Sequence, residues 1–426
     1  MANRETRRRL SRREFIKGIS VGAAGLGLAG AGAWAAEPST GMKYRKLGRT
    51  GLMVSEIGLG TDRIDEQNFS LIPAAIERGV TYIDTAPMYP MQGKGKTEEV
   101  IGRVLKQSSV RDKVVLCTKA TGLKLGGDME KELTERLDAS LKRLQTDRVD
   151  IFMAPHGATA PEHVQNAALF GAFEKLKKQG KARFLGVSTH INYAENCLAA
   201  IRSGYYDVVM SVINISNTSA ALLDEARALR EARARAKGLV WMPLLFDMRP
   251  VVAEAAKKNV GLVAMKAVNG VVEDIRSKVP AQFGQASGMN LFQMCYKWVL
   301  SQESVATIVA NMVTMEMLEQ DVQAPGKKLA RADAEMLERA VASAQVCRMC
   351  GTCSANCPRG VKVADILRFK MYHRAYGTHE AAVQGYRALA AAERASACQD
   401  CGTCEAVCPA GVRVRARLHE AHRRLA

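Results

Sequence analysis

The chain is poor in aromatic residues and has fewer acidic residues than basic ones. Phe, Trp and Tyr make up 5% of its 426 residues, and 43 Asp and Glu stand against 61 Lys and Arg. With so few rings and abundant Ala, we expect an aliphatic core built from strands packed by helices. The net charge of +18 suggests nucleic-acid binding, but seven of the basic residues lie in residues 1–36 and no nucleic-acid motif is present. We therefore predict no nucleic-acid partner.

Two motifs near the C-terminus contain eight of the eleven cysteines, and each reads C-x2-C-x2-C-x3-C-P. This spacing resembles that of bacterial ferredoxins, in which the fourth cysteine of each motif binds the other of two [4Fe–4S] clusters. The ligand sets implied by this resemblance are Cys347, Cys350, Cys353 and Cys408, and Cys398, Cys401, Cys404 and Cys357. Structural zinc sites are the alternative, because they also use C-x2-C pairs, although zinc requires neither the third cysteine nor the repeated proline.

Other cysteine chemistry is not supported. The C-x3-C-x2-C order of radical enzymes that cleave S-adenosylmethionine is absent. The three remaining cysteines, Cys117, Cys197 and Cys295, lie in apolar or helical patterns and are expected to be core residues.

The N-terminal segment resembles a twin-arginine export signal. Residues 11–17 read SRREFIK, a Gly/Ala run follows from 18 to 33, and AWA at 33–35 offers a cleavage site. We predict a signal peptide over residues 1–36 and a periplasmic or extracellular location. Clusters are assembled in the cytoplasm and the twin-arginine route exports folded proteins, so the two ends of the chain agree. An uncleaved membrane anchor is the alternative.

Short apolar segments alternate with amphipathic ones between residues 43 and 325. About eight strand–helix units in such a length are typical of a (β/α)8 TIM barrel, an α/β fold with its active site at the carboxyl ends of the strands. The expected strands are 56–60, 81–84, 114–119, 149–154, 184–189, 208–214, 261–266 and 306–311. The expected helices include 97–106, 130–145, 173–179 and 250–259.

Polar residues follow three successive strands in an order that resembles the Asp-Tyr-Lys-His tetrad of the aldo/keto reductases. They are Asp84 and Tyr89 in DTAPMY, Lys119 in LCTK and His156 in VDIFMAPH. YRKLGRTGLMVSEIGLGT, TEEVIGRVLK, LKKQGKARFLGVST and GLVAMK extend the resemblance over residues 43–320. It implies that Tyr89 exchanges a proton with a carbonyl or alcohol oxygen and that Lys119 lowers its pKa. Asp84 would orient Lys119, and His156 would orient the substrate or relay the proton.

The resemblance weakens where family members bind nicotinamide. Ser188 and Asn214 match expected ligands of the carboxamide, but Met210 replaces the usual Gln and Ile213 the usual Tyr. The segment VANMVTMEMLEQD after the eighth strand has no basic residue, so a preference for NADP over NAD is not supported. Backbone N–H groups of the following helix remain available for a pyrophosphate. We expect NAD(P) binding by an eroded site, with another cofactor as the alternative.

Two segments depart from the family pattern. The insertion over 216–249, with Trp241, Leu244, Leu245 and Phe246 near its end, is expected either to form a substrate wall or to cover the barrel and seat the C-terminal domain. The Gly/Lys loop over 90–96 is expected to flex over the site.

Residues 345–426 are expected to form a small, mainly α-helical ferredoxin domain, because 361–395 has a helical pattern without hairpin signals. The combined prediction is an exported oxidoreductase that interconverts a small carbonyl and an alcohol. Two [4Fe–4S] clusters would relay electrons to or from an external redox partner. The alternative is an electron-transfer subunit whose barrel is catalytically vestigial. Membrane contact is expected only if the signal is retained as an anchor.

Overall fold

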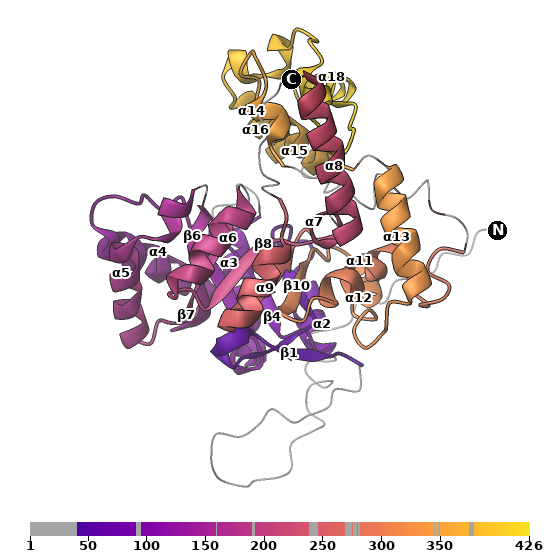
Figure 1. Cartoon of the computed structure of the whole chain (residues 1–426). Coiled ribbons are helices and arrows are strands. Elements are labelled where there is room, and N and C mark those ends of the chain that lie inside the picture. The colour runs from indigo at the N-terminus through magenta and orange to yellow at the C-terminus, as the bar shows by residue number, and fades with distance from the viewer. Residues whose placement is uncertain are drawn as a thin grey trace, which may run out of the picture. The chain divides into compact units, whose positions relative to one another are not determined.

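Eight parallel strands close into a barrel in the order β10-β3-β4-β5-β6-β7-β8-β9 (Figure 1). The computed structural model describes residues 41–90, 95–158, 160–189, 192–237, 246–268, 275, 279, 282–344, 346–347, 350–374 and 379–426. The barrel strands are β3 (Ile57–Gly60), β4 (Tyr82–Asp84), β5 (Val115–Thr121), β6 (Val149–Ala158), β7 (Ala182–Thr189), β8 (Val208–Val212), β9 (Gly261–Met265) and β10 (Val305–Ala310). The prediction of a (β/α)8 barrel is confirmed.

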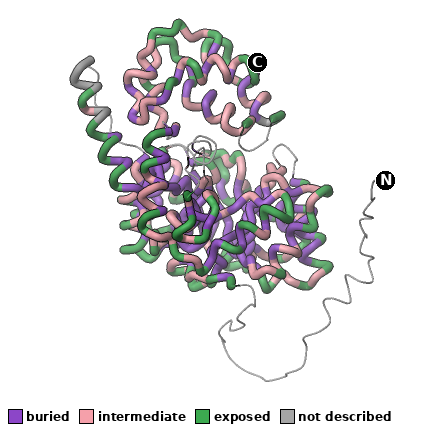
Figure 2. The backbone as a smooth tube through the Cα atoms, turned by 90° about the vertical axis from the view of Figure 1, so that its right-hand side faces the viewer, coloured by how far each residue is buried: buried purple, intermediate pink, exposed green. Residues whose placement is uncertain are grey.

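The barrel strands are buried on both faces, which explains their nearly continuous apolar sequences. In β8 (VVMSV) and β9 (GLVAM) every residue is buried. Side chains such as Tyr82, Met153 and Val263 fill the interior of the barrel. A larger aliphatic core packs together residues of the strands and of the surrounding helices. Figure 2 shows the buried residues concentrated in the centre of the barrel and the exposed ones on its outer helices.

Helices follow the strands and surround the barrel. Their bounds are α2 (Leu71–Glu77), α3 (Lys96–Ser108), α4 (Met129–Leu144), α5 (Ala167–Lys178), α6 (Tyr193–Ser203), α7 (Ile215–Thr218), α8 (Ala220–Lys237), α9 (Arg249–Lys258), α11 (Leu291–Leu300), α12 (Met315–Asp321) and α13 (Arg331–Ser343). Helix α5 begins well before the expected residue 173. Asn166 caps it by accepting a hydrogen bond from the Leu169 backbone N–H at 3.0 Å.

The insertion over 216–249 begins as the two helices α7 and α8. Its residues Trp241, Leu244 and Leu245 lie outside the described part of the chain, as do residues 91–94 of the Gly/Lys loop. Phe246 is fully buried in the barrel core. Of the two roles expected for the apolar end of the insertion, covering the barrel is the one that Phe246 performs.

A two-stranded hairpin packs at the amino ends of the barrel strands. It consists of β1 (Tyr44–Lys46) and β2 (Met53–Ser55), which pair antiparallel, and Leu47 between them is fully buried. Leu47 contacts the start of β9, where a Cβ on Gly261 would come within 2.7 Å of the Leu47 Cδ1. Glycine at 261 thus permits the hairpin to close this end of the barrel.

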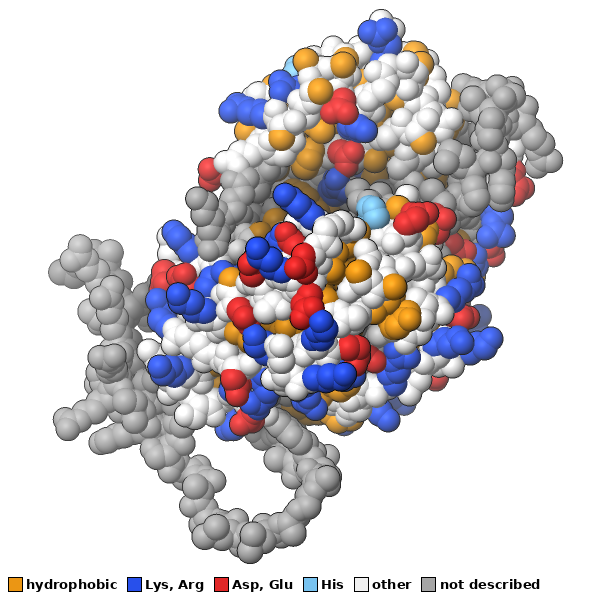
Figure 3. All heavy atoms as spheres, turned by 90° about the vertical axis from the view of Figure 1, so that its left-hand side faces the viewer, with side chains coloured by type: hydrophobic (Ala, Val, Ile, Leu, Met, Phe, Trp, Pro, Cys, Tyr) orange, Lys and Arg blue, Asp and Glu red, His pale blue; other side chains and the backbone are white. Residues whose placement is uncertain are grey.

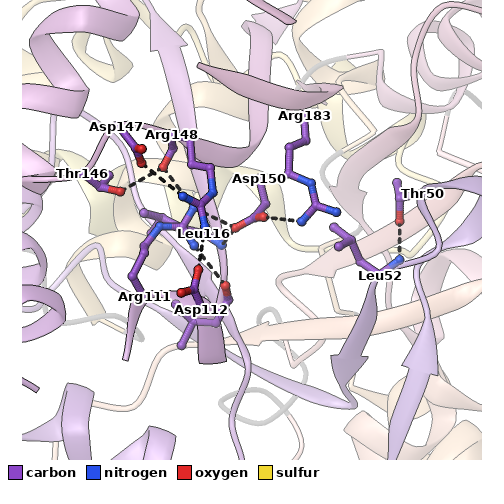
Figure 4. A network of polar contacts seen from close by, with 11 residues as sticks. Thr50, Leu52, Arg111, Asp112, Leu116, Thr146, Asp147, Arg148, Asp150 and Arg183 are labelled. Carbon is purple, nitrogen blue, oxygen red and sulfur yellow. Dashed lines mark hydrogen bonds and ion pairs between the residues drawn. The ribbon is translucent and has the colours of Figure 1, made fainter. Parts of the chain in front are cut away.

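Charged residues also join the amino ends of neighbouring strands (Figure 4). The buried Asp150 of β6 accepts a hydrogen bond from the Leu116 backbone N–H at 3.0 Å. It also forms ion pairs with Arg111 at 2.9 Å and Arg183 at 2.8 Å. This network lies at the end of the barrel opposite the carboxyl ends of the strands, where barrels of this kind do not place their active sites, so we assign it to stability.

The described residues of the C-terminal region form helices joined by turns and irregular segments, without a strand. Its helices are α14 (Thr352–Ala355), α15 (Val363–Arg374), α16 (His379–Arg387), α17 (Thr403–Ala406) and α18 (Val414–Leu425). They share a small core that includes Ile366, Tyr386 and Leu418. The two cysteine motifs fold alike, because Gly351 and Gly402 both adopt a left-handed conformation just before α14 and α17. The predicted helical domain is confirmed.

Residues 40–426 form one compact unit that contains both the barrel and the C-terminal helices. The predicted signal peptide lies outside the described residues. Within the described ranges, no helix combines the length and apolarity needed to cross a bilayer. Figure 3 shows basic and acidic side chains interspersed over the surface in view.

Candidate active site and cysteine sites

The four tetrad residues line one cavity of about 490 Å³. Asp84 is the last residue of β4, Lys119 and His156 lie near the ends of β5 and β6, and Tyr89 lies in the loop after β4. Because all barrel strands run in the same direction, their carboxyl ends meet at one mouth of the barrel. The fold thus brings together four residues that the sequence spreads over 73 positions.

Lys119 and Asp84 form a buried ion pair at the base of the cavity. The Lys119 Nζ lies 2.6 Å from Asp84 Oδ2 and donates a second hydrogen bond to the Thr85 carbonyl at 2.8 Å. Burial disfavours the charged lysine, but Asp84 and Tyr89 outweigh it and raise the pKa of Lys119. Lys119 therefore carries a fixed positive charge in the cavity.

Tyr89 lies next to this charge, with its ring centroid 5.1 Å from the Lys119 Nζ. Burial raises the pKa of the Tyr89 phenol, and Lys119 opposes that rise. Lys119 acts on the pKa of the Tyr89 phenol in the expected direction, and burial outweighs this effect. The phenol is therefore protonated at neutral pH and can donate a hydrogen bond to a substrate oxygen.

His156 is held as a neutral imidazole. Its Nδ1 lies 2.9 Å from Thr121 Oγ1. Burial and then the charge of Lys119 lower the pKa of His156 to about 3. A neutral ring can donate one hydrogen bond to a substrate oxygen, which suits a role in orientation.

Of the two residues expected to bind nicotinamide, only one lines the cavity. Ser188 lines the cavity, is fully buried, and its Oγ has no hydrogen-bond partner in the described part of the chain. Asn214 does not line the cavity. Strand β8 ends at Val212, earlier than expected, and Asn214 instead caps α7, where its Oδ1 accepts from the Ser216 backbone N–H at 3.0 Å. Its Nδ2 donates to the Lys266 carbonyl at 3.3 Å.

Asn311 is a polar cavity residue that the sequence reasoning missed as a site residue. It follows β10 directly, and its buried Oδ1 also has no partner among the described residues. Ser188 and Asn311 therefore leave a hydroxyl and an amide oxygen free for a polar ligand group. The position of Asn311 immediately after a barrel strand is the sequence signal that could have identified it as a site residue.

The structure offers few further contacts for a dinucleotide at the positions where such contacts were expected. Met210 lines the cavity and Ile213 is buried outside it. Helix α12 after β10 has seven residues, and its Thr314 cap already accepts from the Met317 backbone N–H at 3.2 Å. The residues fit the carboxamide end of a nicotinamide better than its phosphates.

Helix α15 of the C-terminal region supplies a wall of the same cavity. Arg368, Phe369 and Tyr372 line it together with the tetrad. Lys266, directly after β9, donates a hydrogen bond from Nζ to the Tyr372 Oη at 2.9 Å. Burial would raise the pKa of Tyr372, but Lys266 outweighs burial and lowers it. Sequence spacing gives no sign of this second Tyr–Lys pair, because its members are 106 positions apart.

The C-terminal cysteines surround two hollows. The first cysteine site consists of Cys347, Cys350, Cys353 and Cys408, and the second cysteine site consists of Cys357, Cys398, Cys401 and Cys404. These sets are the ones that the ferredoxin spacing implied, with the fourth cysteine of each motif placed in the other site. The eleven cysteines, all described, form no disulfide, and Cys117, Cys197 and Cys295 are buried as expected.

The chemistry of the two cysteine sites fits iron–sulfur ligation, because four cysteines line each hollow. Among the described residues, no group of three His, Cys, Asp or Glu could hold a single metal ion. A backbone N–H donates to a sulfur in each site, from Val412 to Cys408 at 3.3 Å and from Asp400 to Cys398 at 3.4 Å. Such N–H donors are a known means of tuning a cluster.

Comparisons with known proteins agree with this architecture. Residues 56–342 match the model of the aldo/keto reductase family, and residues 339–418 match a 4Fe-4S dicluster domain. The chain is 27% identical over 306 residues to the uncharacterized oxidoreductase YqkF of Bacillus subtilis, covering 66% of this chain and 91% of that protein. It is 25% identical over 301 residues to the L-galactose dehydrogenase of Arabidopsis thaliana, covering 67% and 88%.

A solved structure is similar in fold. The aldo-keto reductase AKR11C1 from Bacillus halodurans aligns with a TM-score of 0.53 and 20% identity, over 70% of this chain and 96% of that one. The family match spans the whole barrel and includes the strand ends that form the cavity. This chain therefore belongs to the aldo/keto reductase family, and it is an oxidoreductase whose barrel is followed by a 4Fe-4S dicluster domain.

Proposed function

We propose that this protein is an exported oxidoreductase that interconverts an alcohol and a carbonyl in the barrel cavity and exchanges the electrons with an external partner through two [4Fe–4S] clusters. One observation carries the proposal: the tetrad and helix α15 of the cluster-binding region line the same cavity. If the barrel and the cluster-binding region had unrelated functions, they would not be expected to line one cavity together.

The tetrad supplies the acid–base part of the reaction. Tyr89 donates its proton to a carbonyl oxygen during reduction, or accepts the hydroxyl proton during oxidation. Lys119 stabilises the phenolate that forms in the first case, and Asp84 keeps Lys119 charged and in place. Neutral His156 donates a hydrogen bond to the same oxygen, which fixes its orientation.

The electrons balance when a hydride carrier and two one-electron centres take part. Oxidation of one alcohol to a carbonyl releases two electrons and two protons. A nicotinamide, or another carrier able to take a hydride, would supply two-electron chemistry beside Ser188 and Asn311. The two cysteine sites, with four thiolates each, are suited to hold one-electron centres, and together they match the pair of electrons.

Export is supported by the sequence of residues 1–36 and by the cysteine sites together. A protein that must receive clusters before crossing a membrane needs a route for folded cargo. Replacing Arg12 and Arg13 by Lys should retain the protein in the cytoplasm, as measured by fractionation. Unchanged export would contradict this part of the proposal.

The second candidate function is an electron-transfer subunit with a vestigial barrel. Met210 and Ile213 favour it, because they leave the ring and carboxamide of a nicotinamide with few contacts. The tetrad geometry favours catalysis. The two functions differ in what they predict for Tyr89.

The test compares Tyr89→Phe with Tyr206→Phe after anaerobic purification. Alcohol oxidation is followed with a dye as electron acceptor, starting with sugars and polyols because one relative is an L-galactose dehydrogenase. We expect Tyr89→Phe to lower turnover about 10²- to 10⁴-fold, the usual contribution of a positioned acid or base. Tyr206 is fully buried and does not line the cavity, so its variant should retain activity. Equal turnover of both variants would favour the vestigial barrel.

A parallel titration with NADH and NADPH identifies the carrier. Bleaching of the cluster absorbance at matched stoichiometry would show that a nicotinamide binds and feeds the clusters. Neither binding nor bleaching would direct the search to another hydride carrier.

A further inference from the structure

Helix α15 contacts both the catalytic cavity and the first cysteine site. Arg368, Phe369 and Tyr372 line the cavity, while Ala364 and Leu367 of the same helix line the hollow of the first cysteine site. A helix with its side chains is about 10–12 Å across, so one helix separates the two sites. The position of Leu367 directly before Arg368 makes this separation short.

The first cysteine site also packs against the barrel itself. Cys350 contacts the aliphatic core that includes residues of the barrel strands and their helices. The other cysteines of the first site, Cys347, Cys353 and Cys408, pack in the core of the C-terminal helices, as do Cys357, Cys398 and Cys404 of the second site, so the contact with the barrel core is made by Cys350. The two sites, though built from the same motif, therefore have different neighbours.

The second cysteine site opens to the surface. Cys401 is exposed, whereas its counterpart in the first motif, Cys350, is half-buried. Residues of α15 take part in the second hollow only through Val363 at the amino end of the helix. Val363 lies five positions before Arg368, the first cavity-lining residue of α15, which corresponds to about 7.5 Å along a helix at 1.5 Å per residue, whereas Leu367 of the first hollow is adjacent to Arg368.

We propose that the first cysteine site is the cavity-side redox site of this protein and the second cysteine site is the partner-side one. Electron transfer becomes steeply slower with distance, so the site behind a single helix exchanges with the cavity and the exposed site exchanges with the external partner. The inference rests on the proposed function and adds the order of its centres. During oxidation of an alcohol, the two electrons would leave the cavity one at a time through the first cysteine site to the second and on to the oxidised external partner, and the two protons released would leave to water.

The test compares two matched variants, Cys350→Ser and Cys401→Ser, which alter the second cysteine of each motif. Each variant leaves the other site with all four cysteines. The proteins are reduced with dithionite, and the microwave power that half-saturates the cluster EPR signal is measured with and without dysprosium–EDTA in solution. This paramagnetic complex acts on a cluster more strongly the closer it can approach, so the readout reports exposure and does not require turnover.

We expect dysprosium–EDTA to raise the half-saturation power several-fold in Cys350→Ser, which retains the second cysteine site. It should change little in Cys401→Ser, which retains the first. Equal effects, or the reverse order, would overturn the inference and leave the proposed function standing.

The unaltered protein provides a second measurement in case a variant loses both clusters. Its saturation curve should contain two components, of which dysprosium–EDTA shifts only one. A curve that shifts as a whole would overturn the inference. A complete absence of cluster signal in the unaltered, anaerobically purified protein would overturn the proposed function itself.

Discussion

At the scale of single residues, the cavity depends on charges held away from water. Lys119 and Asp84 are both buried, and Lys119 donates hydrogen bonds to Asp84 Oδ2 and to the Thr85 carbonyl. A buried charge that loses its partner is costly, whereas removal of both charges is tolerated far better. We therefore expect the pair to stabilise the fold in addition to its proposed part in catalysis.

We predict that Lys119→Met destabilises the protein by about 3–5 kcal/mol, because it leaves Asp84 as an unpaired buried carboxylate. The double variant Asp84→Asn with Lys119→Met should recover a large part of this loss. Urea unfolding followed by circular dichroism measures both. A double variant no more stable than Lys119→Met alone would mean that the two side chains contribute to stability independently of each other.

His156 should make stability depend on pH. Its pKa is about 3 in the folded protein, below the usual value of about 6.5 in an unfolded chain. Between these values the unfolded state binds the extra proton, so stability falls as pH decreases through this window. The slope contributed by His156 is at most about 1.4 kcal/mol per pH unit.

The variant His156→Asn cannot titrate in this range and keeps hydrogen-bonding capacity toward Thr121. Its unfolding free energy should fall less steeply than that of the original protein between pH 6 and pH 4. Parallel slopes for the two proteins would show that His156 is accessible to protons in the folded state.

At the scale of secondary-structure elements, two helix glycines differ in what surrounds them. Gly102 in α3 lies against α4, and a Cβ there would be 2.5 Å from the Arg143 carbonyl oxygen. Gly171 in α5 has no atom within 4 Å of the place a Cβ would occupy. The close approach of α3 and α4 therefore depends on Gly102, whereas no helix contact requires a glycine at 171.

We predict opposite effects of the same substitution at these positions. Gly102→Ala should destabilise by about 1–3 kcal/mol, because the two helices must separate. Gly171→Ala should stabilise by up to about 1 kcal/mol through its higher helix propensity. Thermal unfolding of the two variants side by side tests the prediction, and shifts of the same sign would contradict it.

At the scale of the whole molecule, the C-terminal helices have a small core of their own, to which several of the cluster-site cysteines contribute. Domains with few apolar contacts often require a bound metal to remain folded. One of these helices, α15, lines the barrel cavity through Arg368, Phe369 and Tyr372. Loss of the clusters is therefore expected to affect the barrel site as well.

We predict that removing iron from the reduced protein with a chelator makes residues 346–426 sensitive to protease while the barrel stays resistant. Limited proteolysis with mass spectrometry locates the cleavages. The untreated protein under the same conditions is the control. Identical fragments before and after chelation would show that the C-terminal region folds without its clusters.

The positions of strands and helices followed from the sequence because their signals are local. Apolar runs such as VVMSV and GLVAM are buried on both sides of the barrel, and the ends of eight strands were placed to within a few residues. Two errors in the expected boundaries arose at helix N-caps. Asn166 caps α5, so this helix begins earlier than expected, and Asn214 caps α7, so strand β8 ends earlier than expected. Short-range hydrogen bonds of this kind compete with periodicity and are not visible in it.

The sequence by itself determined the barrel, the order of the tetrad and the two groups of cysteines, because each depends on spacing along the chain. Only the tertiary structure decided that Ser188 reaches the cavity while Asn214 does not, and that Tyr372 joins Lys266 there. It also decided which cysteine site lies behind α15. These features are contacts between residues far apart in sequence. They follow from how whole elements pack, which no local pattern of residues specifies.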